Sequence, residues 1–246
     1  MKPITKTILY LTIFSIAMGY LESSVVVYLR KIYYPDGFKF PLIPVSSDIA
    51  ITEFLREVAT IIMLIGAGIM AGKNAVQRFA FFIYSFAIWD IFYYVFLKVL
   101  LNWPESLFTW DILFLIPFPW VGPVIAPCIV SLTMIFLTLI IVYHQEKDKH
   151  VHISFINWMF LILGSIKVIS SFMWDYIMYL SANGTDKVVW TLSSNTNLFE
   201  EVNNYIPQQF NWWLFGIGEG FILIAILLIL KRLKNSQKPK LSTNNY

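Results

Sequence analysis

Six apolar stretches of about 20 residues or more follow one another along this chain of 246 residues. They limit its fold more than any other feature, because a helix of that length crosses the roughly 30 Å hydrocarbon core of a bilayer. Mean hydropathy is +0.67, and only 13% of the residues are charged, whereas soluble domains average about 25%. The chain is therefore predicted to be an integral membrane protein and not an ordinary soluble domain.

The six stretches are predicted to be transmembrane helices. Backbone that crosses hydrocarbon must close its own hydrogen bonds, and a barrel would show alternating polar and apolar residues, which these stretches lack. The predicted helices cover residues 8–29, 49–71, 79–101, 121–143, 153–181 and 211–231. The expected fold is an all-α polytopic membrane bundle: one six-helix domain over residues 1–231 and a disordered, basic cytoplasmic tail over residues 232–246.

The approach to the fourth predicted helix is rich in proline. The segment 112–127 contains Pro117, Pro119, Pro123 and Pro127, and proline lacks the backbone N–H that a helix interior needs. We expect this segment to form an interfacial or re-entrant approach that roofs part of any polar site. The fourth helix itself has no charge from residue 130 to 143, and we expect it to pack outside that site.

Lysine and arginine are distributed unevenly between the two ends of the predicted helices. With a cytoplasmic N-terminus, eleven of them lie on the cytoplasmic side and four on the other side. The positive-inside rule therefore predicts that both termini are cytoplasmic. The basic tail is expected to hold the last helix against anionic lipid of the bilayer.

Ionisable residues lie inside or beside five of the six predicted helices. A charge at the bilayer centre costs about 2.5–3.5 kcal/mol on insertion scales, so these side chains should face one another or water. The candidate ligand-binding or ion-binding residues are Glu22, Glu53, Arg56, Glu57, Asp90, Tyr94, Lys98, Asp111, Lys167, Asp175 and Glu219. They predict an outward-opening polar cavity between the first, second, third, fifth and sixth helices.

Acids outnumber bases among these residues. Six acids of the helices face three bases, and Arg30 and Asp111 add one of each at the rim. In a low dielectric such an excess is relieved when some carboxylates hold a proton or a cation. A different interpretation is that the charged residues form ion pairs that only hold the bundle together.

Several cofactors and partners are excluded by composition. The histidines (His144, His150 and His152) all follow the fourth predicted helix, and Cys128 is the single cysteine. No haem, iron–sulfur or zinc motif is therefore present, and no other cofactor is indicated. No basic face with interleaved aromatic residues indicates a nucleic-acid partner. The Gly68-x-x-x-Gly72 and Gly216-x-x-x-Gly220 motifs are interpreted as close helix contacts, and such a face also suits a homo-oligomer.

Three motifs lie in the first half of the chain. They are Tyr20-Leu21-Glu22 followed by residues 25–30 (VVVYLR), residues 89–94 (WDIFYY) with Lys98, and Trp103-Pro104 followed by Trp110-Asp111. Together these motifs resemble a family of small prokaryotic six-span integral membrane proteins. The resemblance implies a location in the cytoplasmic (inner) membrane and no established activity, so no catalytic role is carried over.

These observations favour a binding or transport protein whose acidic cavity takes a proton, a cation or a small amphiphilic ligand. In this hypothesis four carboxylates bind and three bases modulate them: Glu22, Glu57, Asp90 and Glu219, with Arg56, Lys98 and Lys167. An alternative is an intramembrane enzyme acting on a lipid or isoprenoid at the outer leaflet, with Glu53 and Glu57 as magnesium ligands. Another is an accessory subunit of a membrane complex, docked through its outer aromatic residues.

Overall fold

The computed structural model describes residues 3–43, 45–114, 119–147, 151–182 and 204–235. Within these ranges the chain forms six long helices: α1 (Pro3–Tyr33), α2 (Ser47–Ala71), α3 (Ala75–Leu101), α4 (Ile125–Gln145), α5 (Phe155–Ala182) and α7 (Trp212–Asn235). All six are long and apolar enough to cross a membrane. The prediction of an all-α bundle of six transmembrane helices is confirmed.

The first and last helices are longer than their predicted spans. α1 begins at Pro3 and ends at Tyr33, and α7 continues to Asn235, beyond the predicted domain boundary at residue 231. Basic residues in the last turn favour this continuation, because they lie beside the negative end of the helix dipole. The remainder of the predicted tail, residues 236–246, lies outside the described residues.

A short antiparallel β-hairpin precedes α4. Strand β1 (Trp110–Phe114) pairs with β2 (Trp120–Pro123), with Trp110 opposite Pro123 at the end of the ladder. The prediction that residues 121–124 are helical is therefore wrong, and α4 begins only at Ile125. Pro123 ends its strand, and Pro127 lies in the first turn of α4, where its missing N–H breaks no hydrogen bond.

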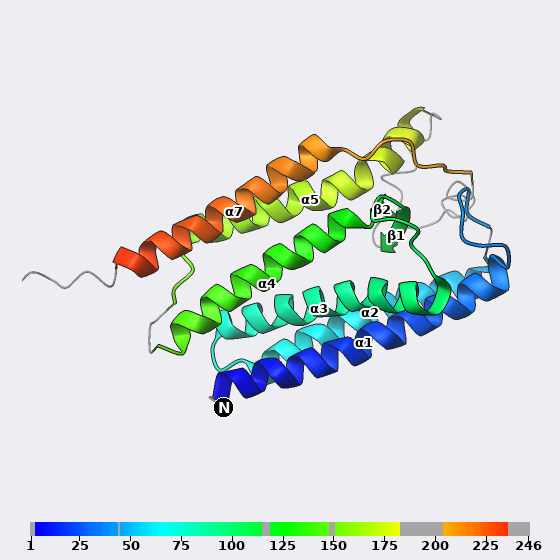
Figure 1. Cartoon of the computed structure of the whole chain (residues 1–246). Coiled ribbons are helices and arrows are strands. Elements are labelled where there is room, and N and C mark those ends of the chain that lie inside the picture. Colours follow the sequence, from blue (N-terminus) through cyan, green and yellow to red (C-terminus); the bar gives the residue numbers. More distant parts are fainter. Residues whose placement is uncertain (1–2, 44, 115–118, 148–150, 183–203, 236–246) are drawn as a thin grey trace, which may run out of the picture.

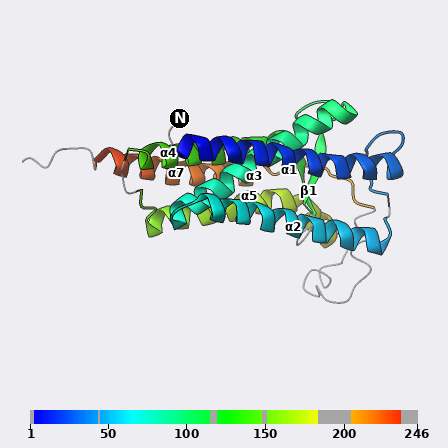
Figure 2. The same cartoon turned by 90° about the horizontal axis from the view of Figure 1, so that it is seen from below.

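The helices form two groups that α4 connects (Figure 1). α3 packs against α1, α2 and α4, while α5 and α7 form a close pair and α4 also contacts α7. Both ends of the described chain lie at the same end of the bundle, which we call the N-terminal end. The hairpin lies toward the opposite end, the hairpin end, and the view from below shows the same arrangement (Figure 2).

The pair α5 and α7 depends on two facing glycines. A Cβ atom added to Gly164 would lie 2.8 Å from the carbonyl oxygen of Gly218, and one added to Gly218 would lie 2.9 Å from that of Gly164. Gly68 and Gly72 make a similar approach to α3, as predicted. A Cβ atom added to Gly216 or to Gly220, in contrast, would meet nothing within 4 Å among the described residues. The interpretation of Gly216-x-x-x-Gly220 as a close contact is therefore wrong within this chain, and an oligomeric contact there stays a prediction.

Candidate functional site

A small cavity of about 60 Å³ lies between α1, α2, α3 and β1. Its wall consists of Glu22, Val26, Arg56, Glu57, Trp89, Asp90, Tyr93, Tyr94, Ile112, Leu113 and Phe114. The three helices supply the charged groups, and β1 supplies an apolar wall. A buried water needs about 10–15 Å³ on such a measure, so the cavity has room for a few water molecules.

Arg56 joins two carboxylates beside this cavity. Its Nε donates to Glu53 Oε2 at 2.9 Å, and Nη1 forms an ion pair with Glu22 of α1. Thr60 also donates to Glu22, at 3.3 Å. Arginine suits this position because its planar group of five N–H donors can serve two carboxylates at once. One base is thereby shared between two acids, and the contact ties α1 to α2.

Asp90 of α3 is the carboxylate with the clearest single partner. The hydroxyl of Ser131 in α4 donates to Asp90 Oδ2 at 2.8 Å, and both residues are buried. Trp89 lines the same cavity, and its indole N–H has no hydrogen-bond partner among the described residues. A buried indole N–H normally donates to some acceptor, so this orphan donor is consistent with a cavity that holds water.

A buried ion pair lies beside the cavity, where β1 meets the end of α1. Arg30 donates through Nη2 to Asp111 Oδ1 at 3.1 Å, and the guanidinium carbon lies 3.7 Å from the ring centroid of Trp103 and 4.3 Å from that of Phe38. The two aromatic rings stabilise the cation. Burial raises the pKa of Asp111 to about 6, although Arg30 and the hydroxyl of Tyr94 lower it. The loss of hydration outweighs the attraction of the pair, as is common for buried ions.

The raised pKa of Asp111 predicts a pH-dependent stability. Between its ordinary value of 3.8 and about 6, the folded protein holds a proton on Asp111 that the unfolded chain has released. The free energy of unfolding should therefore fall as pH rises from about 4 to 6, by up to roughly 3 kcal/mol, and change little from this cause above pH 6.

Unfolding of the detergent-solubilised protein at pH 4, 5, 6 and 7 measures this effect. In the Asp111→Asn variant, the slope of the free energy of unfolding against pH should correspond to about one bound proton fewer, because asparagine does not titrate. Asp36→Asn, which changes an exposed acid, is the control and should keep the wild-type slope. An Asp111→Asn variant with an unchanged slope would contradict the assignment.

Three predicted site residues lie away from the cavity. Lys98 donates to the carbonyl oxygens of Asn102 and Pro104, at 3.3 and 3.0 Å, beyond the end of α3. Lys167 is exposed on α5. Asp175 accepts a hydrogen bond from the hydroxyl of Tyr205 at 2.6 Å and others from the backbone N–H groups of residues 208 and 209. Asp175 thus holds the segment before α7 against α5.

Glu219 is also separate from the cavity. It is buried in α7, and the hydroxyl of Thr133 in α4 donates to its Oε2 at 2.9 Å. Its other oxygen, Oε1, is buried with no hydrogen-bond partner among the described residues. The expected cavity between five helices is therefore divided, because α5 and α7 pack on each other and α7 contacts α4, whereas neither packs against α1 or α2.

The expectation that α4 packs outside the polar sites is wrong. Ser131 and Thr133 of α4 each donate to a buried carboxylate, one on α3 and one on α7. Residues two apart project from opposite sides of a helix and differ by about 3 Å along its axis. The sequence around Ser131 and Thr133 did not indicate these contacts with carboxylates, because single hydroxyl residues are ordinary in transmembrane helices. Trp103 was noted in a motif, but its contact with Arg30 was not foreseen.

Six apolar helices with buried ionisable side chains define the class of this molecule: it is a multi-pass integral membrane protein. Comparisons of the chain with protein families, with characterised proteins and with solved structures found no match. The family resemblance of its motifs stays a prediction. In the part of the chain that the structure describes, no three His, Cys, Asp or Glu residues form a group suited to a metal ion.

Proposed function

We propose that this protein is an integral membrane binding or transport protein whose cavity takes up a proton or a small cation. The proposal is based on the charge of the cavity wall. Glu22, Glu57 and Asp90 line the cavity together with one base, Arg56, which is also paired with Glu53. Such an excess of carboxylates in a low-dielectric site is stabilised by positive charge from solution.

The volume of the cavity favours a small ligand over a large one. At about 60 Å³ it is several-fold smaller than the roughly 300–1,000 Å³ of pockets that hold drug-sized ligands. A lipid or isoprenoid substrate needs the larger space, which supports a proton or cation over the intramembrane enzyme. Asp90 is the proposed binding carboxylate, with Ser131 orienting it and Arg56 holding Glu22 in the cavity wall.

The same proposal includes a location. We place the protein in the cytoplasmic membrane of a prokaryote with both termini in the cytoplasm. The excess of Lys and Arg at the N-terminal end supports this orientation, as does the position of both described chain ends at that end (Figure 1). The cavity would then lie in the outer half of the bilayer.

Proton movement into proteoliposomes tests the function. Protein reconstituted in vesicles with an internal pH-sensitive dye should dissipate an imposed pH gradient, with sodium or potassium present or absent. Asp90→Asn should slow this by roughly 10-fold or more, a rise of about 1.4 kcal/mol in the barrier, because the asparagine side chain cannot take up and release a proton. Glu105→Gln, a change at an exposed acid outside the cavity, should leave the rate unchanged.

Two further results decide the matter. Size-exclusion profiles must show that Asp90→Asn remains folded, and a cation-dependent rise in thermal stability of the wild type should disappear in this variant. If folded Asp90→Asn matches the wild type in both proton movement and cation response, the cavity has no such function.

A further inference from the structure

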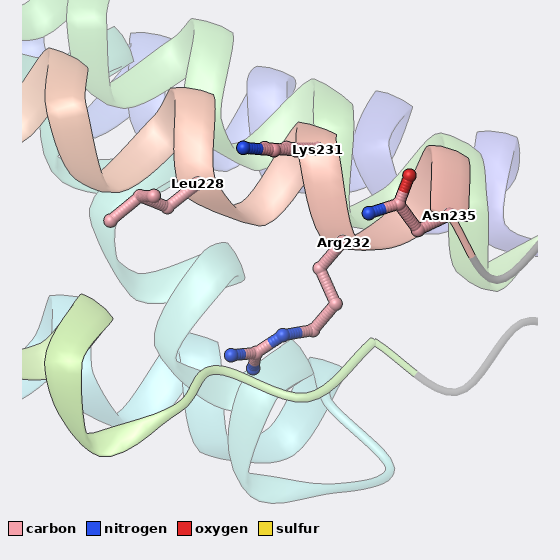
Figure 3. Close-up of a pocket in the computed structure, with 4 residues that line it drawn as sticks. All are labelled: Leu228, Lys231, Arg232 and Asn235. Carbon is pink, nitrogen blue, oxygen red and sulfur yellow. The ribbon is translucent and has the colours of Figure 1, made fainter.

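A cavity that moves an ion across the membrane needs a path to the N-terminal end of the bundle. An open hollow of about 440 Å³ lies at that end, lined by Leu228, Lys231, Arg232 and Asn235 (Figure 3). Lys231 and Arg232 point in different directions there. All four residues belong to α7, whereas the wall of the acidic cavity comes from α1, α2, α3 and β1. A path from the cavity therefore has to run between α1, α2 and α3.

α1 and α3 run in the same direction and contact each other in a regular register (Figure 1). A Cβ atom added to Gly19 would lie 3.0 Å from the carbonyl oxygen of Trp89, and Ser23 donates to the carbonyl oxygen of Tyr93 at 3.0 Å. Each contact joins residues that are 70 positions apart. Residues at steps of four on one face of α1 thus lie opposite residues of α3 at the same steps.

One turn closer to the N-terminal end, this register places Ser15 of α1 opposite Ser85 of α3. Both side chains are 0% exposed, and neither hydroxyl has a hydrogen-bond partner among the described residues. The neighbouring hydroxyls of Thr12, Ser23 and Ser24 instead donate to the carbonyl oxygen four residues earlier. Buried polar groups without a protein partner typically hold an ordered water, which makes about three hydrogen bonds. One water between the two serines would satisfy both hydroxyls.

Polar groups continue on both sides of this serine pair. Toward the cavity, Trp89 lies one turn from Ser85 on the same face of α3, and it lines the cavity. Toward the N-terminal end, Thr12 Oγ1 and the hydroxyl oxygen of Tyr84 are 2.8 Å apart, and Thr12 donates to the carbonyl oxygen of Ile8. Ile8 is five residues from the start of α1, about 7.5 Å along the helix axis. The polar groups thus extend from the cavity to near the N-terminal end.

We propose that a proton, and no metal cation, passes between the cavity and the N-terminal end along a row of hydroxyl groups: Ser15, Ser85, Thr12 and Tyr84. This inference rests on the proposed function and names the ion that crosses. A hydroxyl both donates and accepts hydrogen bonds, so each oxygen of the row, or of a water between them, accepts a proton on one side and releases its own on the other.

The same groups stop a metal cation. A cation that leaves the cavity needs oxygen ligands that replace its hydration shell. Two buried serines supply too few of them, and the indole N–H of Trp89 is a donor only. A cation that enters the cavity therefore stays there.

Proteoliposomes with an internal pH-sensitive dye test the row in the full-length protein. Ser15→Ala/Ser85→Ala should slow the dissipation of an imposed pH gradient by roughly 10-fold, about 1.4 kcal/mol in the barrier, because a methyl group neither accepts nor donates a proton. Each single variant should give part of this effect, which keeps the test open if the double variant is unstable. Uptake of radioactive sodium by wild-type vesicles should stay at background.

Ser171→Ala is the matched control for this test. Ser171 is a buried serine of α5, and its hydroxyl donates to the carbonyl oxygen of Val168 at 2.6 Å, away from the row. This variant should keep the wild-type rate. Thermal unfolding checks that the variants are folded, and any cation-dependent rise in stability should remain in them, because the cavity is intact.

The outcomes separate this inference from the proposed function. If the wild type moves protons and folded Ser15→Ala/Ser85→Ala moves them equally fast, the row is not the path, although the proposed function stands. Sodium uptake by the wild type would overturn the assignment of the proton. A wild type that moves neither ion would overturn the proposed function and this inference with it.

Discussion

Replacing Arg56 by alanine is expected to destabilise the protein by about 3 kcal/mol, near the lower end of the usual cost of removing one partner from a buried ion pair, because Arg56, Glu22 and Glu53 are only partly buried. The change would leave Glu22 and Glu53 without the base that they share. A loss of this size is a large part of the roughly 5–15 kcal/mol that stabilises a typical fold. It would also weaken the contact between α1 and α2, where only the hydrogen bond from Thr60 to Glu22 would remain among the polar contacts described here.

Unfolding of the solubilised protein by heat or by denaturing detergent measures this change. Arg56→Lys should recover part of the loss, because lysine keeps the charge without the fork of N–H donors. Adding Glu22→Gln and Glu53→Gln to Arg56→Ala should recover part of it too, since the carboxylates would no longer be left as charges. Lys31→Ala, an exposed cation on α1, is the control. If Arg56→Ala is as stable as Lys31→Ala, the ion-pair geometry is wrong.

Replacing Gly164 by leucine is expected to be similarly damaging, for a steric reason. The Cβ atom alone would lie 2.7 Å from Ile222 Cγ1 and 2.8 Å from the Gly218 carbonyl oxygen, so the rest of the leucine would occupy space that α7 fills. Overpacking of a core costs about 1–3 kcal/mol and occasionally more. Because backbone is the obstacle here, we expect about 3 kcal/mol or more.

Gly220→Leu is the matched control for this variant. A Cβ atom at Gly220 meets nothing within 4 Å, so the same substitution on the neighbouring helix should change the free energy of unfolding by less than about 1 kcal/mol. Thermal unfolding of the two variants in the same detergent compares them directly. Equal stability of the two would show that α5 and α7 do not approach at Gly164.

The sequence was sufficient to predict the helices, because uninterrupted apolar length leaves the backbone no other structure in lipid. It indicated an irregular approach at the prolines of residues 112–127, but residues 121–124 were still predicted to be helical. It did not predict the β-hairpin that replaces that helix, because the pairing of Trp110 with Pro123 depends on contacts between distant residues. Strand pairing has no local periodic signal as strong as that of a helix.

The candidate site was predicted in part. Five of the predicted residues, from three helices, line one cavity, as expected if charged groups avoid lipid by facing one another: Glu22, Arg56, Glu57, Asp90 and Tyr94. Glu53 and Arg56 are three residues apart on one helix, and they do form an ion pair. Spacing along a helix does not say which helices are neighbours, so Lys167 and Glu219 were assigned to a cavity that α5 and α7 do not reach. The two hydroxyls of α4 that bind Asp90 and Glu219 were missed for the same reason.

The position of α4 has a consequence for movement within the bundle. Its polar contacts are short and directional: Ser131 and Thr138 bind groups of α3, and Thr133 binds Glu219 of α7. If α5 and α7 slide or tilt relative to the other helices, α4 must lose its hydrogen bonds either to α3 or to α7. A hydrogen bond weakens steeply once its geometry is lost. α4 has no Asp, Glu, Lys or Arg of its own, yet it hydrogen-bonds to both Asp90 and Glu219. Protonation of either carboxylate would therefore change a contact of the helix that connects the two groups.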